Sequence, residues 1–431
     1  MSVPLPDAVT AAVVVTGDEV LLGRVRDENG PYIARDLEDA GCRVERIVVV
    51  GDDPDRLVAA IRSQVVEGTA VVVVTGGLGP TADDRTMEAV ATVAGVPLER
   101  DDRALQMVRE RMRAIRRTGV AEDEFRRIQE KQAYLPHGAT VLPPVGTAPG
   151  CRLRIGRTLV VVLPGPPNEL QPMWRETRHR GELGELLSVL MRNETRTMRL
   201  WWVTEAELML ALSGLPGPVM ERIGTYTRHG ELEVVVPDGD SDVVETLLRA
   251  RFPQALFAVD GREVDAIVAE HLVATGAMVA VAESCTGGAL GARLVARSGA
   301  SAWFAGGVIS YSNDVKVALL GVSPGAIEAD GAVSERVARE MAEGARRSAG
   351  AEWGVSITGV AGPDGGTPEK PVGTVWIGVA GPDGVDAELF RLPPADRGVV
   401  QRRAVTAAMH RLRLRLAGAA DRDGGDRSRR P

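Results

Sequence analysis

Apolar residues along the first part of the chain predict alternating strands and helices. Short, largely β-branched runs occupy residues 11–15, 44–50 and 71–74. Between them, residues 31–37 and 54–66 carry apolar side chains at helical spacing. Continuous apolar runs are typical of buried parallel strands, and strand–helix–strand alternation indicates a sheet with helices on both faces. We therefore predict a three-layer αβα domain of α/β class, with a further helix over residues 86–94.

The same alternation returns near the other end of the chain. Apolar runs at residues 278–281, 303–309 and 353–357 each end in small, polar or basic residues. Helical patterns follow at residues 289–295 and 314–320. In an open α/β sheet, ligands bind at the carboxyl ends of the strands. We expect a second α/β domain whose polar strand ends converge on one site.

The stretch between these regions has a weaker pattern. Residues 198–203 and 231–236 look like strands, and residues 204–212 and 242–251 look like helices. This mixture predicts a small α+β connector. The last residues are charged and rich in glycine, a composition typical of disorder. The expected domains are therefore residues 1–180, 192–253 and 262–418, followed by a disordered tail at residues 419–431.

The segment Ala282–Gly288 holds the strongest candidate for chemistry. Ser284 stands where a predicted strand gives way to a helix, followed by Thr286 and Gly287. Backbone N–H groups at a helix start favour an oxyanion or a phosphate. The alternative is a serine N-cap with glycines that ease a tight turn.

A serine nucleophile needs a base, and histidine is the usual one. Of the five histidines in the chain, only His271 and His410 lie beyond residue 260, and neither is near a motif. Lys316 is the better candidate, since burial can lower the pKa of a lysine enough for it to act as a base. The alternative is a solvated lysine on a helix. Tyr311 could relay a proton or orient Ser284, and Cys285 is a rival nucleophile whose side chain would point to the other face of a strand.

The first domain has its own candidate site in the glycine-rich loop that follows residues 71–74. Its backbone could cradle phosphates. Asp83 and Asp84 at the end of this loop could hold a divalent metal through oxygen ligands. The alternative is a Gly-Pro turn with an aspartate that caps the next helix.

Composition narrows the function classes. The chain has 431 residues and a formal net charge of −8, without a basic block, so we expect no nucleic-acid partner. Its three cysteines are too scattered for a disulfide framework or a thiolate zinc site. No apolar run is long enough to span a membrane, so we expect no membrane partner and a cytoplasmic location.

Four stretches give the C-terminal region a specific resemblance: AESCTGG at 282–288, GGVISYSNDVK at 306–316, GAVSE at 331–335 and TGVAGPDGGTPEKPVGTV at 358–375. The region resembles the C-terminal domain of the CinA (competence/damage-inducible protein A) family, which is similar to nicotinamide-nucleotide amidohydrolases. The resemblance implies hydrolysis of the carboxamide of nicotinamide mononucleotide (NMN), without a cofactor, by Ser284, Tyr311 and Lys316. The residues we expect at the substrate are Glu283, Thr286, Gly287, Gly288, Asn313, Thr358, Gly359, Ala361 and Gly362.

Residues 11–180 resemble the molybdopterin-binding domain at the CinA N-terminus, through stretches such as TGDEVLLG at 16–23, TGGLGPTADD at 75–84 and LPGPPNEL at 163–170. The resemblance implies an ADP-ribose pyrophosphatase that uses a divalent metal such as Mg²⁺, bound by Asp84, with Asp18 and Asp83 as further candidate ligands. One departure is Asp27-Glu28-Asn29 where the family commonly has Asn-Thr-Asn; the added carboxylate could change the affinity for metal or phosphate. The expected site residues are Gly17, Asp18, Glu19, Asn29, Thr75, Gly76, Gly77, Gly79, Thr81, Asp83, Asp84, Lys131 and Gly165.

Two other readings stay open. The first domain could bind molybdopterin or an adenylated relative without turnover. The whole chain could instead be a nucleotide-responsive regulatory protein. We expect small-molecule nucleotides as partners and a symmetric homodimer, the commonest assembly for enzymes of this size.

Overall fold

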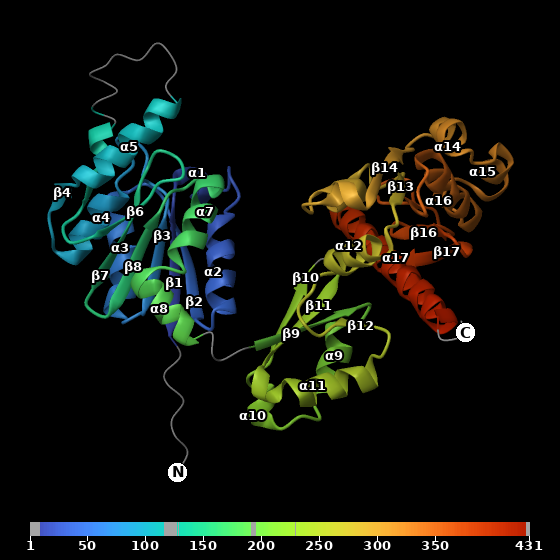
Figure 1. Ribbon diagram of the computed structural model, residues 1–431, viewed down its shortest axis with the longest axis horizontal. Coiled ribbons are helices and arrows are strands. Elements are labelled where there is room, and N and C mark those ends of the chain that lie inside the picture. Colours follow the sequence, from blue (N-terminus) through green and yellow to red (C-terminus); the bar gives the residue numbers. More distant parts are fainter. Residues whose placement is uncertain (1–8, 116–126, 128, 191–194, 229, 428–431) are drawn as a thin grey trace. The chain divides into compact units, whose positions relative to one another are not determined.

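A computed structural model describes residues 9–115, 127, 129–190, 195–228 and 230–427 (Figure 1). The chain forms two compact units, Met1–Thr195 and Arg196–Pro431. Each unit is built on its own sheet or sheets, and each is described by itself below.

The first unit has a six-stranded sheet in the order β2-β1-β3-β8-β7-β6. The four strands from β2 to β8 run parallel, and β7 and β6 are antiparallel additions at one edge. Successive strands therefore lie on opposite sides of β1, which places a switch point between β1 and β3, where ligands bind in such sheets. The strands are β1 Thr10–Thr16, β2 Arg43–Val50, β3 Val71–Thr75, β6 Thr140–Leu142, β7 Gly150–Ile155 and β8 Thr158–Leu163.

Helices cover both faces of this sheet and bury two apolar clusters (Figure 1). One cluster joins the sheet to α2 (Asn29–Asp39), α7 (Pro167–Thr177) and α8 (Gly181–Leu190). The other joins it to α3 (Pro54–Val66) and α4 (Thr86–Ala94). The predicted αβα architecture is therefore confirmed. The remaining elements are α1 Asp18–Leu21, β4 Leu98–Arg100, α5 Asp102–Ile115 and β5 Tyr134–Pro136.

The second unit begins with the small α+β module expected between the two larger regions. Its sheet has the order β10-β11-β9-β12. A capping box starts α9, because Thr204 and Glu207 exchange side-chain and backbone hydrogen bonds. The elements are β9 Thr195–Trp201, α9 Glu205–Leu212, α10 Gly217–Met220, β10 Gly224–Arg228, β11 Glu231–Pro237, α11 Asp238–Arg251 and β12 Leu256–Ala258.

The larger sheet of this unit has the order β14-β13-β15-β16-β17. The first three strands are parallel, and β16 and β17 continue the sheet antiparallel. All three predicted strands are present, and each ends at the same edge of the sheet. The strands are β13 Val279–Glu283, β14 Phe304–Ile309, β15 Trp353–Gly359, β16 Thr374–Gly381 and β17 Gly384–Arg391.

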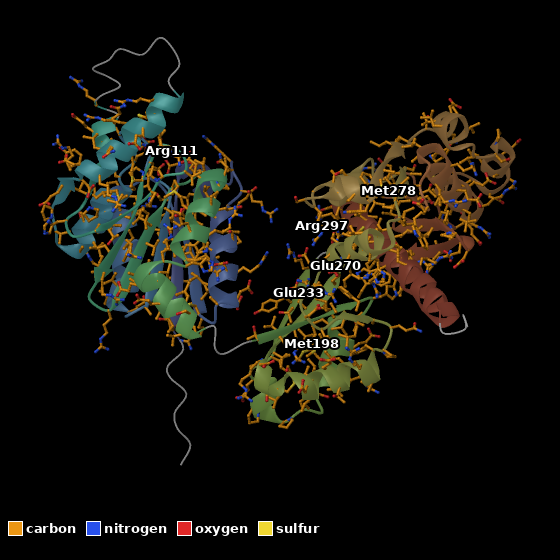
Figure 2. All side chains as sticks on the ribbon, in the orientation of Figure 1. Arg111, Met198, Glu233, Glu270, Met278 and Arg297 are labelled. Atoms are coloured by element: carbon orange, nitrogen blue, oxygen red, sulfur yellow. The ribbon has the colours of Figure 1, made fainter. Side chains whose placement is uncertain are left out.

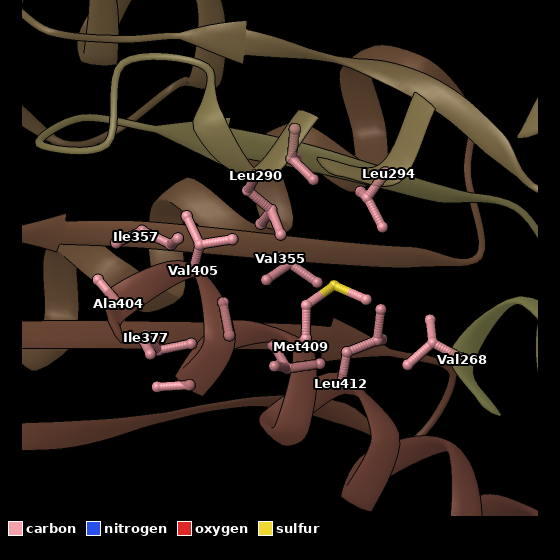
Figure 3. Close-up of a cluster of buried hydrophobic side chains, with 14 of the residues drawn as sticks. Val268, Leu290, Leu294, Val355, Ile357, Ile377, Ala404, Val405, Met409 and Leu412 are labelled. Atoms are coloured by element: carbon pink, nitrogen blue, oxygen red, sulfur yellow. The ribbon is translucent and has the colours of Figure 1, made fainter. Parts of the chain in front are cut away.

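Helices again cover both faces of the sheet. In the larger apolar cluster, Val355 and Ile377 of the sheet pack with Leu290, Met409 and Leu412 from the covering helices (Figure 3). That face is covered by α12 (Val264–Thr275), α13 (Ala289–Val295) and α17 (Arg397–Arg427). The other face is covered by α14 (Asn313–Leu320), α15 (Pro324–Asp330) and α16 (Glu335–Ala349), and the turn η1 is Ala300–Ala302.

The connector and the C-terminal sheet domain share one compact unit. His410 on α17 lies in the contact between them: its Nε2 is 2.8 Å from Glu231 Oε1. Its ring stacks on that of Trp201, with centroids 4.4 Å apart. His410 is fully buried, and this burial lowers its pKa well below the usual 6.5, with Arg413 and Arg293 adding to the effect. The buried imidazole therefore packs the connector against α17.

The predicted disordered tail needs correction. Helix α17 continues to Arg427, so residues 419–427 are helical, and residues 428–431 lie outside the described residues. Composition predicted disorder because residues 421–431 include no apolar residue. Once α17 is nucleated on the sheet, however, each further residue adds one backbone hydrogen bond, and propagation is far less costly than nucleation.

Among the helices of the described residues, none is both long enough and apolar enough to cross a membrane.

Candidate active site of the second unit

Three strand ends meet at Ser284. The Ser284 N–H donates to the carbonyl of Ile357 on β15 at 2.9 Å, and Ser310 N–H donates to the Glu283 carbonyl at 2.7 Å. These bonds continue the parallel ladders past β13, β14 and β15. The residues that follow each strand are therefore held side by side, as the sequence predicted.

Lys316 points from α14 at the Ser284 hydroxyl. Its Nζ lies 3.1 Å from Ser284 Oγ and also donates to the carbonyls of Ser310 at 2.7 Å and Tyr311 at 3.2 Å. The side chain is almost fully buried, which excludes the solvated-lysine alternative. Burial lowers the pKa of Lys316, while the nearby Cys285 acts in the opposite direction. The pair thus places a hydroxyl against an amine that loses its proton more easily than an exposed lysine does.

Glu283 organises the loop and does not face a substrate. Its buried carboxylate accepts hydrogen bonds from Thr286 Oγ1 at 2.6 Å and from Gly288 N at 3.1 Å. It also accepts from the N–H groups of Leu290 at 3.0 Å and Gly291 at 2.8 Å. The predicted substrate contacts of Glu283 and of the Thr286 hydroxyl therefore need correction, because both groups are used within the protein. A carboxylate at the start of α13 also complements the helix dipole.

The same bonds decide which N–H groups remain for an oxyanion. Gly288 N is used by Glu283, and Gly287 N donates to the Ser284 carbonyl at 3.2 Å. Gly287 is therefore not the donor that we expected. Among the hydrogen bonds of the described residues, the backbone N–H groups of Cys285 and Thr286 have no acceptor. These two adjacent donors follow the nucleophile directly, a common arrangement for stabilising a tetrahedral oxyanion.

Tyr311 takes a different place from the one predicted. Its side chain is 65% exposed, and its hydroxyl is 3.3 Å from Arg397 Nη2, not near Ser284 or Lys316. Its backbone carbonyl, in contrast, accepts from Lys316. Tyr311 therefore orients the lysine through its main chain, while its phenol and Arg397 form a polar rim. Arg397 also donates to the Gly362 carbonyl at 2.8 Å.

Sequence reasoning did not find Arg397. The residue stands at the start of α17, far from any of the quoted motifs, and no local pattern distinguishes it from the other arginines of the chain.

Cys285 is excluded as the nucleophile by its surroundings. Its side chain belongs to the apolar cluster against α12, α13 and α17. Burial raises the pKa of its thiol to about 12. The thiol is therefore protonated at neutral pH, and only a thiolate attacks efficiently. The expected alternation of side chains at Ser284 and Cys285 is present.

In the loop after β15, three of the residues that we expected at the substrate are used within the protein instead. The Thr358 hydroxyl donates to the Ala332 carbonyl at 2.8 Å, and Ala361 is part of the apolar cluster. A Cβ on Gly359 would lie 2.7 Å from the Thr374 carbonyl oxygen, so this glycine lets β16 approach. These three positions shape the loop from within. Gly362, bonded to Arg397, and the exposed Asn313 at the start of α14 remain on the side of Tyr311.

The first unit has a cavity of about 480 Å³ at the carboxyl ends of β1, β3 and β8. It therefore lies at the predicted switch point of the sheet. Ten of the thirteen residues expected at this site line it, namely Gly17, Glu19, Asn29, Thr75, Gly76, Gly77, Gly79, Asp83, Asp84 and Gly165.

Three expected residues lie beside this cavity rather than in its lining. Asp18 exchanges hydrogen bonds with Asp52: each backbone N–H donates to the other carboxylate. Lys131 Nζ donates to the Thr81 carbonyl, and Lys131 lines a neighbouring hollow that shares Asp84. The Thr81 N–H donates to Asp84 Oδ2 at 2.9 Å. The turn alternative is thus partly correct, since one oxygen of Asp84 stabilises its own turn.

Two carboxylates in this cavity were missed. Asp52 follows β2, so the strand-end rule could have found it. Burial raises its pKa, against the hydrogen bond from the Asp18 N–H, which lowers it. Glu169 lies in the first turn of α7, and burial raises its pKa too. A Cβ on Gly146 would lie 2.1 Å from the Glu169 carboxylate, so only glycine leaves room for it.

The polar groups that line the cavity can be compared with the ligands that a divalent metal needs. No group of three or more His, Cys, Asp and Glu side chains suited to a metal ion occurs among the described residues. Mg²⁺ is commonly bound by only one or two carboxylates together with substrate phosphates. A site with fewer than three protein ligands is therefore still compatible with Mg²⁺. Asn29 Oδ1 is buried and has no hydrogen-bond partner within the described part of the chain. Asp27 lines the same cavity, and its Oδ1 accepts the N–H groups of Asn29 and Gly30 at the start of α2.

Comparison with known proteins finds a matching family model for each of the two larger regions of the chain. Residues 262–416 match the family model described as "CinA C-terminal domain", and residues 12–180 match "Probable molybdopterin binding domain". A CinA-like protein of Mycolicibacterium vanbaalenii is 43% identical over 419 residues, covering 95% of this chain and 99% of that protein. The chain belongs to the CinA-like protein family.

A second relative and one solved structure are also similar to this chain. A CinA-like protein of Mycobacterium tuberculosis is 42% identical over 422 residues, covering 95% of this chain and 97% of its own. A crystal structure of the competence/damage inducible protein CihA from Agrobacterium tumefaciens is 33% identical and covers 37% of this chain and 99% of that one, with a TM-score of 0.35.

Proposed function

We propose that the second unit is a serine amidohydrolase that converts NMN and water to nicotinate mononucleotide and ammonia, as part of pyridine nucleotide recycling. The single observation that carries the proposal is the buried contact of 3.1 Å between Lys316 Nζ and Ser284 Oγ. The resemblance of the surrounding stretches to nicotinamide-nucleotide amidohydrolases supplies the substrate.

The mechanism follows from the positions of the side chains. Neutral Lys316 takes the proton of Ser284 as Oγ attacks the carboxamide carbon. The developing oxyanion accepts from the free N–H groups of Cys285 and Thr286. Lys316 then returns the proton to the leaving nitrogen, the C–N bond breaks, and ammonia departs from an acyl-serine. Water, deprotonated by the same amine, attacks this ester. Lys316 then gives that proton to Ser284 Oγ as the ester bond breaks, which releases the acid and restores free Ser284 and the neutral amine.

Ammonia release from NMN by the purified chain, with and without EDTA, tests this proposal. We expect release that survives EDTA and is abolished in Ser284→Ala. The matched control is Ser348→Ala, which removes a hydroxyl from the exposed end of α16. Retained turnover in Ser284→Ala, or no turnover in a folded wild-type sample, would overturn the assignment.

A second activity is favoured by the cavity of the first unit. We propose that it hydrolyses ADP-ribose to AMP and ribose 5-phosphate, with water attacking a phosphorus atom of the diphosphate and the bridging P–O bond breaking. Asp84 and the free Oδ1 of Asn29 would hold a divalent metal, which when bound supplies a Lewis acid to the phosphate oxygens. Asp52 and Glu169, whose pKa values burial raises, are placed to accept or hold a proton.

AMP release from ADP-ribose with added Mg²⁺ tests the second activity. We expect Asp84→Ala to lower the rate strongly, while Asp102→Ala, at an exposed carboxylate on α5, leaves it unchanged. Undiminished release from Asp84→Ala would remove this residue from the mechanism. If wild type binds the nucleotide but releases no AMP, the domain is a binding module, as the alternative reading holds.

A further inference from the structure

The second unit has a cavity whose lining does not include Ser284. It has a volume of about 720 Å³, which suits a ligand larger than a single phosphate. The connector contributes Arg228, and the C-terminal domain contributes residues of α13 and α17, among them Arg293 and Gln401. Neither the proposed amidase nor the proposed diphosphatase uses this cavity.

The acidic residues in the lining already have basic partners. Glu263 pairs with Arg228 at 3.1 Å, and Asp265 pairs with Arg293 at 2.6 Å. Glu231, the third carboxylate, lies beside His410. None of these carboxylates is available to neutralise a further cation in the lining.

Two arginines in the same lining are not part of these pairs. Arg297, labelled in Figure 2, follows the end of α13, and Arg402 lies on α17. Both side chains are exposed, and within the described part of the chain neither makes a hydrogen bond or an ion pair. A guanidinium group is a planar fork that matches the oxygens of a phosphate. The apolar part of the lining consists of small side chains such as Ala289, so recognition rests on the charged groups.

The cavity is joined to the nucleophile loop by one side chain. Gln401 lines the cavity, and its Nε2 donates to the carbonyl of Cys285 at 2.8 Å. Cys285 follows Ser284 directly and carries one of the two free N–H groups of the proposed oxyanion site. A ligand that displaces Gln401 therefore acts on the same peptide segment that would stabilise the transition state.

We infer that this cavity binds a phosphorylated small molecule through Arg297 and Arg402 and that its occupancy alters the Ser284 loop through Gln401. The binding part stands on the geometry of the cavity alone. The effect on turnover rests on the proposed amidase.

Inorganic pyrophosphate is the probe, and calorimetry on the full chain in EDTA measures its binding. We expect Arg297→Gln/Arg402→Gln to weaken binding at least about tenfold, since each lost charged hydrogen bond to an anion is worth that much. The matched control, Arg336→Gln/Arg339→Gln, removes two arginines of α16 that pair with glutamates. Thermal melting checks that both double variants fold. Equal binding by wild type and Arg297→Gln/Arg402→Gln, or no heat of binding in wild type, would overturn the site.

The coupling is tested separately by ammonia release from NMN at saturating pyrophosphate. We expect the rate of wild type to change at least about twofold, and the rates of Arg297→Gln/Arg402→Gln and Gln401→Met to stay constant. Gln401→Met should still bind pyrophosphate. A response in Gln401→Met equal to that of wild type would refute the link through this side chain. If no ammonia is released at all, the amidase proposal fails, while calorimetry still decides whether the anion site exists.

Discussion

Lys316 Nζ lies 3.1 Å from Ser284 Oγ, and two main-chain carbonyls hold the amine at this position. The carbonyls of Ser310 and Tyr311 have no charge with which to offset burial of an ammonium group. Desolvation therefore dominates, and the pKa of Lys316 is lowered. A lysine in this setting is suited to exchange a proton with a hydroxyl.

Replacing the amine should abolish the proposed reaction without unfolding the protein. Lys316→Met keeps the length of the side chain and removes the base, so we expect kcat for ammonia release to fall by about 10²–10⁴-fold. Lys370→Met, whose Nζ bonds the Asp330 carbonyl, is the matched control and should retain wild-type turnover. Normal turnover in Lys316→Met would show that another group takes the serine proton.

The rate should also depend on pH with a definite sign. Only the neutral amine accepts a proton, so kcat should rise with pH and level off above the pKa of Lys316. Because burial lowers that pKa, the rise should occur below the usual 10.5. Ammonia release measured across the neutral and alkaline range gives the profile. A rate that falls as the amine becomes neutral would contradict the assignment of Lys316 as base.

Removing the neighbouring thiol should leave the chemistry intact. The thiol of Cys285 has its pKa raised to about 12 and packs in the apolar cluster. We expect Cys285→Ala to keep kcat within a few-fold and to lower the free energy of unfolding by about 1 kcal/mol, for the small cavity that it leaves. Ammonia release and urea denaturation measure the two effects. Loss of turnover in a folded Cys285→Ala would transfer the nucleophile from Ser284 to Cys285.

The carboxylate under the loop should be as important for stability as for rate. In Glu283→Gln, an amide NH₂ replaces one of two oxygens that together accept four hydrogen bonds. We expect unfolding to become easier by about 1–3 kcal/mol and kcat to fall, because the loop that carries Ser284 shifts. Glu352→Gln, where one oxygen accepts only the Met278 N–H, is the matched control. Equal stability of the two variants would show that the Ser284 loop is stable without its full set of hydrogen bonds to Glu283.

His410 predicts a pH dependence of stability. Its folded pKa lies well below 6.5, through burial and then through Arg413 and Arg293, against the opposing charge of Asp265 and the nearby Glu231. As pH falls below 6.5, the unfolded chain binds a proton that the folded chain refuses, so stability falls. We expect His410→Gln to flatten this loss in urea unfolding of the full chain. Identical slopes for wild type and variant would exclude His410 as its source.

Regular elements were predictable because their signals are local. The expected helices over residues 86–94 and 289–295 occur with those bounds. Of the three strands around Ser284, β14 ends with its apolar run, and β13 and β15 each continue two residues beyond theirs. The convergence of Ser284 and Lys316 followed from one topological rule, that parallel strands present their carboxyl ends together.

The sequence did not predict which way several side chains point or which groups they bind. From the sequence, Glu283 is only a polar residue at a strand end. The three-dimensional structure shows that its oxygens accept backbone N–H groups at the start of α13. Tyr311 lies next to buried Ser310 and turns outward to solvent. Arg397 reaches the site from α17, more than a hundred residues after Ser284, and such a contact depends on packing that no periodicity describes.

Helix α17 touches three parts of the second unit in order. Arg397 bonds the Gly362 carbonyl, Gln401 bonds the Cys285 carbonyl, and His410 lies against Glu231 of the connector. At the rise of an α-helix, the first and last of these contacts are about 20 Å apart. An α-helix with continuous backbone hydrogen bonds bends little over this distance, so we expect a tilt of the connector at His410 to move Gln401 and Arg397 as well. Under the proposed amidase, the connector would then influence the position of the loop that carries Ser284.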